Sequence, residues 1–106
     1  MQTIQLKKFG NVLVSRPAGL EAFNAIRPQL DPNELIQIDF DNVLTITPSW
    51  LDEFLTQLTN FNDGKVALLP TKNASVLPAL PVLAEARQDF VATIIKQAIK
   101  EAEKSE

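Results

Sequence analysis

One short stretch of the chain, residues 39–53, brings together most of the side chains that could do chemistry. It reads DFDNVLTITPSWLDE and places Ser49 close to the start of an expected helix. Thr47 is a good N-cap, and Pro48 suits the first helical position because that position needs no amide donor. A phosphate on a hydroxyl at a helix start is stabilised by the helix dipole and the free amides. Ser49 therefore displays a hydroxyl at a place where a phosphate would be stabilised.

An alternative interpretation of Ser49 is structural. The serine would then be an exposed residue of the first helical turn, or a capping residue partnered by Asp52. Asp52 and Glu53 lie one turn away and would repel a phosphate on Ser49. In the functional interpretation, this repulsion changes the surface that a partner protein meets.

The composition removes most catalytic chemistry. The chain contains no His, Cys or Tyr, so the commonest general base, the thiolate nucleophile and the phenol acid are all absent. Its three glycines form no phosphate-binding loop, and Asp39 with Asp41 offers too few ligands for a cation. We expect no catalytic residue, no metal site and no cofactor. A small enzyme using Asp39, Asp52 or Glu53 is the least favoured interpretation.

Charge and hydropathy narrow the partners further. The net charge is −3, and residues 28–64 hold seven acids with no Lys or Arg, so a surface formed there would repel nucleic acid. No window approaches the roughly 20 apolar residues of a membrane span, and the N-terminus lacks a signal-peptide pattern. We expect a soluble, cytoplasmic protein with no nucleic-acid or membrane partner.

The elements that must position Ser49 are expected to alternate along the chain. Ile4 and Leu6 alternate with polar residues, and a Phe-Gly-Asn turn at 9–11 precedes a short strand at 12–14, which predicts an N-terminal β-hairpin. Further on we expect a helix from Ser15 to near Pro28, a strand at 35–40, the Ser49 helix ending near 62–64, and a strand at 66–69.

This order of elements defines the expected fold class. Strands alternating with helices predict an α/β fold with a small, mostly parallel, four-stranded sheet and helices packed on it. The length suits a single domain over residues 1–106.

The C-terminal third is expected to be helical. A short helix is predicted from about residue 74, with Thr71, Asn73 or Ser75 as its cap, and a long helix over about 81–103. The long helix has a wide apolar face, which covers one side of the sheet in the simpler interpretation. In the alternative, part of that face meets a second subunit or a partner protein. Its candidate contact residues are Phe90, Val91, Ile94 and Ile95.

A family resemblance is carried by the motif Asp39-Phe40, Val43, Ile46-Thr47, Ser49-Trp50 and Asp52-Glu53. With this motif the central segment resembles a bacterial family, the STAS-like domains of unknown function. The resemblance is specific in the central fifteen residues and extends over about residues 10–85. More distantly, such domains are similar to anti-sigma-factor antagonists and to the cytoplasmic STAS domains of anion transporters. In the antagonists, a serine at the start of the helix after a central strand is phosphorylated by a partner kinase. That serine falls on Ser49, so the resemblance implies Ser49 as the candidate phosphoacceptor.

The sequence thus predicts a non-catalytic regulatory module that binds another protein in bacterial signalling. The resemblance implies a kinase-like ATPase or another regulator as partner. The alternative is a homodimeric structural or scaffold domain that works through its apolar C-terminal helix. The expected partner-binding surface around Ser49 comprises Thr47, Trp50, Asp52, Glu53 and Thr56.

Overall fold

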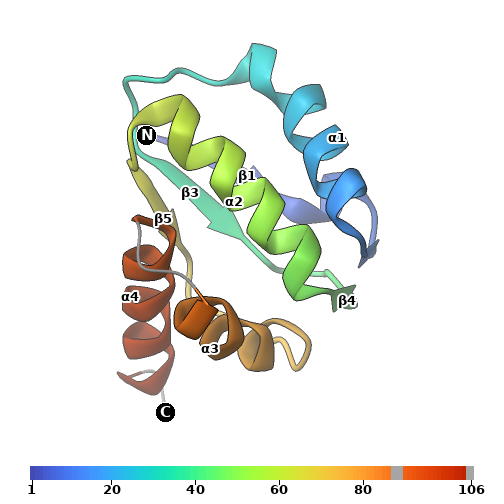
Figure 1. Cartoon of the computed structure of the whole chain (residues 1–106), viewed down its shortest axis with the longest axis vertical. Helices are drawn as coiled ribbons and strands as arrows, with labels where there is room; N and C mark the ends of the chain where they lie inside the picture. The colour runs from blue at the N-terminus through green and yellow to red at the C-terminus, as the bar shows by residue number, and fades with distance from the viewer. Residues whose placement is uncertain (87–89, 105–106) are drawn as a thin grey trace.

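The computed structural model describes residues 1–86 and 90–104, and its strands form two small parallel sheets (Figure 1). The larger sheet has the order β1-β3-β5, and the smaller one pairs β2 with β4. The predicted α/β class is confirmed, but the single four-stranded sheet is wrong. The strands are β1 (Gln2–Gln5), β2 (Val12–Leu13), β3 (Ile36–Asp39), β4 (Thr45–Ile46) and β5 (Val66–Leu68).

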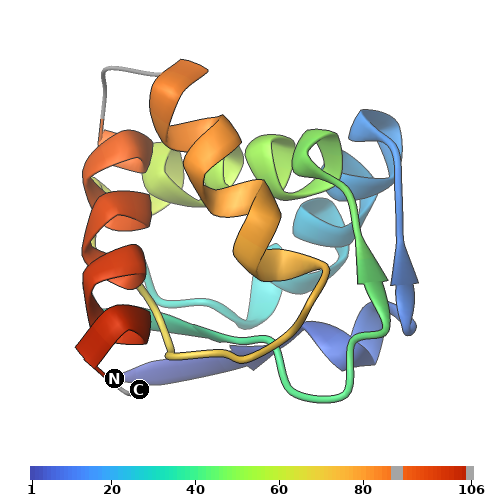
Figure 2. The same ribbon diagram turned by 90° about the horizontal axis from the view of Figure 1, so that it is seen from below.

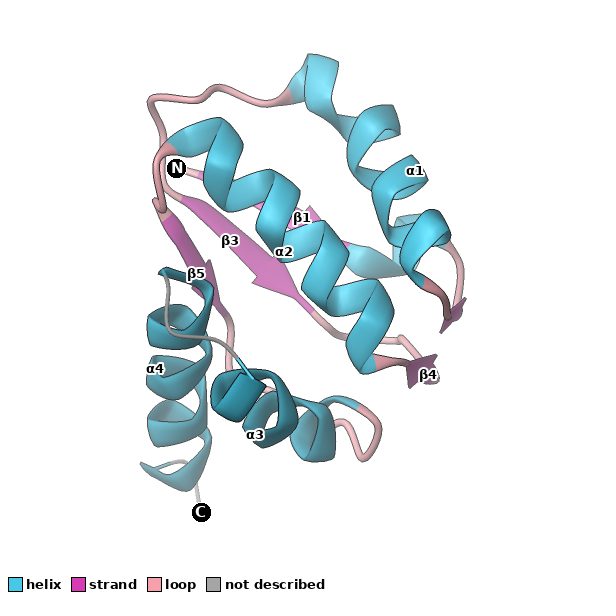
Figure 3. Ribbon diagram, in the orientation of Figure 1, coloured by secondary structure: helices cyan, strands magenta, loops and turns pink. Residues whose placement is uncertain are grey.

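Helices α1 and α2 lie side by side over one face of the larger sheet, and α3 and α4 pack together beside β5 (Figures 2 and 3). None of the helices in the described ranges is both long and apolar enough to cross a membrane. The helices are α1 (Arg16–Ile26), α2 (Pro48–Asn62), α3 (Val76–Ala86) and α4 (Phe90–Lys104), with short 3₁₀ helices η1 (Leu6–Phe9) and η2 (Arg27–Gln29).

The core lies between the larger sheet and α1 and α2. In β3, Ile36 and Ile38 are fully buried, whereas Gln37 and Asp39 are only half-buried on the other face. This alternation follows from the two-residue period of a strand. The two isoleucines therefore share the core face of β3, and Asp39 lies on the other face.

The predicted N-terminal hairpin is wrong, because residues 6–9 form η1 instead of extending β1. Leu6 is fully buried, and the Phe9 ring packs on Trp50 and Phe54 at centroid distances of 6.2 and 5.7 Å. Burying these two apolar side chains removes them from water and separates β1 from β2. Gly10 then turns the chain at a φ of 114°, which favours glycine.

The long C-terminal helix predicted over 81–103 is also wrong, because residues 81–86 belong to α3. Helix α3 runs through Pro81, although proline removes one helical hydrogen bond. Pro81 is exposed. One apolar stripe on another side of the helix includes residues before and after the proline. Burial of that stripe against the core favours one continuous helix. Its members are Val76, Ala79, Leu80 and Leu83, all buried.

Candidate docking site at the start of helix α2

Helix α2 begins where the sequence predicts. The Thr47 hydroxyl accepts a hydrogen bond from the Trp50 amide at 3.4 Å, and Pro48 is the first helical residue. Ser49 is exposed at the second position. Its hydroxyl makes no hydrogen bond with any of the described residues. The serine is therefore accessible on a helix start whose backbone is fixed by a local cap.

Backbone hydrogen bonds to β2 hold β4 and this helix start in place from one side. The Thr47 amide donates to the Leu13 carbonyl of β2 at 2.9 Å, and the Thr45 amide donates to the Asn11 carbonyl at 3.0 Å. These bonds attach the residues just before Ser49 to β2.

The loop between β5 and α3 holds β4 from the other side. The Ser75 hydroxyl accepts from the Ile46 amide at 2.9 Å and donates to the Ile46 carbonyl at 3.0 Å. One hydroxyl thus satisfies both backbone groups that a further strand would pair.

Asn73 fixes the same loop. Its Oδ1 accepts from the amides of Ser75 and Val76 at 2.7 and 3.2 Å, and its Nδ2 donates to the Val43 carbonyl. The sequence indicated Asn73 and Ser75 only as helix caps. Their contact with the segment before Ser49 joins residues 29 and 30 positions apart, a distance that local patterns do not predict.

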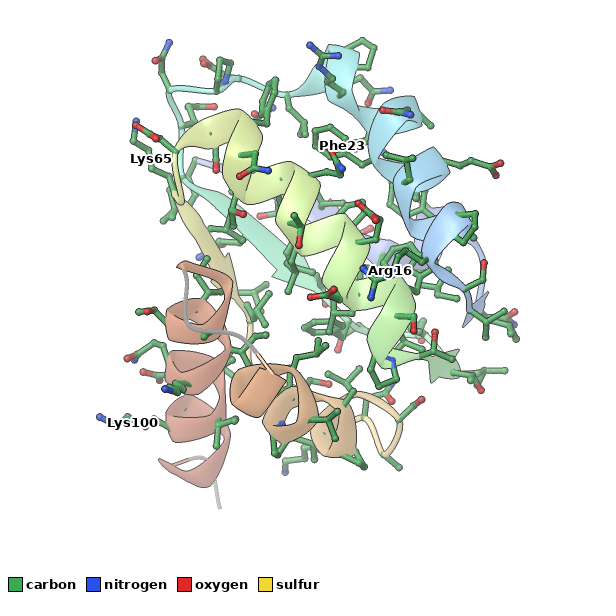
Figure 4. All side chains as sticks on the ribbon, viewed as in Figure 1. Arg16, Phe23, Lys65 and Lys100 are labelled. Atoms are coloured by element: carbon green, nitrogen blue, oxygen red, sulfur yellow. The ribbon has the colours of Figure 1, made fainter. Side chains whose placement is uncertain are left out.

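Arg16 joins α1 to the Ser49 helix (Figure 4). Its Nη1 lies 2.7 Å from Asp52 Oδ2 and 3.7 Å from Glu53 Oε1. The two helices approach each other closely at Gly19. A Cβ atom at that position would lie 2.5 Å from the Trp50 carbonyl oxygen. Helix α1 therefore covers the side of α2 that carries Asp52. Sequence reasoning gave Arg16 no role in the site.

Two of the predicted surface residues need correction. Trp50 is 1% exposed, and its ring stacks on Phe54 at a centroid distance of 5.0 Å, so Trp50 belongs to the core and cannot meet a partner. Asp52 is buried to 9% exposure beneath Arg16. The remaining members, Thr47, Glu53 and Thr56, are half-buried. The surface around Ser49 is therefore smaller than predicted.

Two of the four residues of the alternative dimer face, Ile94 and Ile95, can be placed in the structure. Ile95 is fully buried within its own chain, and Ile94 packs against the core. Ile95 is therefore not available to a second copy, because it already contacts its own core. The side chains of Phe90 and Val91 lie outside the described residues.

Other candidate sites in the described part of the chain are weak. No group of three or more acidic side chains there is placed to hold a metal ion. A shallow hollow of about 550 Å³ lies at the C-terminal ends of α1 and α2, remote in sequence from Ser49. It is lined by Asn24, Arg27, Pro28, Leu30, Pro32 and Phe61.

No protein-family model, curated protein or solved structure matches this chain.

Proposed function

We propose that the chain is a STAS-like, non-catalytic regulatory module that binds a partner protein through the start of helix α2. The observation that supports this proposal best is the exposed Ser49 on a helix start held by three neighbours. The Thr47 cap, the β2 backbone and the Ser75 hydroxyl fix the backbone around it. A rigid backbone favours binding, because little conformational entropy is lost when a partner docks.

The charges around Ser49 suit a switch. A phosphate at the second helical position would gain from the helix dipole and from amides of the first turn. Asp52 and Glu53 would oppose it, but Arg16 lies on both carboxylates and offsets part of their charge. Phosphorylation of Ser49 is thus tolerable for the fold, and it changes the charge of the exposed surface.

The chemistry of the partner follows from the same features. A protein that adds or reads a phosphate on Ser49 would be a kinase-like ATPase or another regulator, which is the partner class that the resemblance implies. The absence of His, Cys and Tyr from the chain favours recognition over catalysis, since the usual acid-base and nucleophilic groups are missing.

A recovery experiment with tagged chains from the source cells tests this proposal. Ser49→Arg should abolish recovery of a partner, because a long cation would occupy the centre of the surface. Asn60→Arg is the matched control. Asn60 is exposed on α2, as Ser49 is, but it lies near the opposite end of the helix. Loss of the partner with both variants, or with neither, would contradict a surface centred on Ser49.

The same purified chain tests the switch by mass spectrometry. A phosphate on Ser49 under any growth condition supports switching. A chain that remains unmodified under every condition would exclude the switch and leave constitutive docking as the proposed function.

A further inference from the structure

Strand β2 has one open edge, at the end of the molecule remote from α4 (Figure 2). Within the described residues, β2 pairs only with β4. The carbonyls of Asn11 and Leu13 accept from the amides of Thr45 and Thr47 at 3.0 and 2.9 Å, so these two carbonyls point toward β4. Peptide groups alternate in direction along a strand, and the amide and carbonyl of Val12 therefore point to the open side.

The side chains along this edge are apolar and exposed. Val12 is 57% exposed and Val14 is 42% exposed. Proteins usually protect such edges with a charge or a proline, and residues 11–14 contain neither. Unpaired backbone groups beside apolar side chains fit an extended peptide segment.

The charges at the two ends of β2 indicate which segment fits. Lys7 and Lys8 are exposed just before the strand, and neither has an ion pair within the described residues. Arg16 follows the strand, and its charge is taken up by Asp52 and Glu53. If two copies paired antiparallel through β2, the lysines of each would approach this end of the other, where both carboxylates already pair with Arg16. An acidic segment instead supplies carboxylates that are free to pair with Lys7 and Lys8.

We infer that the β2 edge accepts an acidic, extended segment of a partner protein by strand addition. Apolar side chains of the segment pack against Val12 and Val14, and its carboxylates face Lys7 and Lys8. This inference rests on the proposed function, and it names the partner chemistry of a second surface. The edge is continuous with the start of α2 through the bond between Thr47 and Leu13.

The test uses the full chain labelled with ¹⁵N and short synthetic peptides as probes. The first peptide alternates valine with threonine and ends in two glutamates, and the second ends in two lysines. The acidic peptide should slow hydrogen exchange of the Val12 and Val14 amides and bind at least about tenfold more tightly than the basic one. A version of the acidic peptide methylated on its backbone nitrogens should not bind, because it cannot pair with a strand.

Edge variants locate the binding. Val12→Lys should weaken binding of the acidic peptide at least about tenfold, because a charge on the apolar edge disfavours strand pairing. Val12→Pro removes the open amide, and melting curves show whether each variant still folds. Val82→Lys is the matched control, since Val82 is 56% exposed on α3 against 57% for Val12. Its affinity for the peptide should equal that of the unaltered chain.

Several results would overturn the inference. These are equal binding of both peptides, protection away from β2, or protection that rises with protein concentration in the absence of peptide, which would indicate a second copy. If the Val12→Lys chain still recovers the partner and the Ser49→Arg chain does not, the inference about the β2 edge fails. The proposed docking site at the start of α2 then stands. Recovery of no partner by the unaltered chain would overturn the proposed function, and the peptide titration would still decide the edge.

Discussion

The ion pair between Arg16 and Asp52 joins the first residue of α1 to the second turn of α2. The Asp52 side chain is 12% exposed, whereas that of Arg16 is 51% exposed. A carboxylate in such a place needs a partner, because burial of an unpaired charge is costly. Exposure of the arginine lets solvent screen the attraction, so the pair contributes less than a fully buried one.

Removal of the guanidinium should therefore destabilise the protein moderately. We expect Arg16→Ala to lower the free energy of unfolding by about 1–2 kcal/mol, because Asp52 remains largely buried without its cation. Arg27→Ala is the control, since Arg27 is exposed and has no ion pair within the described residues, and it should change stability by less than about 0.5 kcal/mol. Urea unfolding of both variants measures the difference. Equal losses would show that the pair has no special role.

Single residues also show where sequence reasoning succeeded. The cap at Thr47 and the exposure of Ser49 were predictable, because both depend on neighbours within one helical turn. The role of Arg16 was not, since its contact spans 36 positions. Trp50 was assigned to the docking surface, and the structure contradicts this prediction because the ring is buried and stacks on Phe54.

At the scale of elements, β4 has a strand on one side and only a side chain on the other. Its two residues pair with β2 on one side, and the Ser75 hydroxyl occupies the other side at Ile46. Since β4 leads directly into Thr47, the position of the α2 start depends on this contact. A strand of two residues has few hydrogen bonds of its own, so the loss of one partner matters.

Deletion of that hydroxyl should weaken the element. Ser75→Ala should lower the free energy of unfolding by about 1–3 kcal/mol, because it leaves the amide and carbonyl of the buried residue Ile46 without their partner. It should also speed hydrogen exchange of the Ile46 amide. Ser49→Ala makes the same chemical change at an exposed hydroxyl and should cost less than about 0.5 kcal/mol. Unchanged exchange at Ile46 would contradict a supporting role for Ser75.

The bounds of elements were predictable where local signals set them. Helix α2 ends at Asn62, and Asp63 and Gly64 follow with φ of 61° and 81°, as the Asn-Asp-Gly sequence indicates. Residues 6–9 were not predictable as η1, because the Phe9 ring packs on Trp50 and Phe54, which lie far along the chain. At Pro81, the local helix-breaking rule was outweighed by burial of the apolar stripe of α3.

At the scale of the whole molecule, the order of elements predicted the α/β class but not the division into two sheets. Within the described residues, β2 and β4 pair only with each other and form the second sheet. This arrangement places the β2 edge next to the start of α2 (Figure 2). Both candidate surfaces thus lie near one end of the molecule, with α4 at the other.

The central claim is that a partner protein docks at the start of α2. Its most direct test is photo-cross-linking in the source cells, with a photoreactive residue placed in turn at Ser49, Asn60 and Thr93, all of which are exposed. A discrete adduct with a different protein is expected from Ser49, and none from Asn60. An adduct formed only from Thr93, with a second copy of this chain, would contradict docking at the start of α2 and favour a dimer through α4.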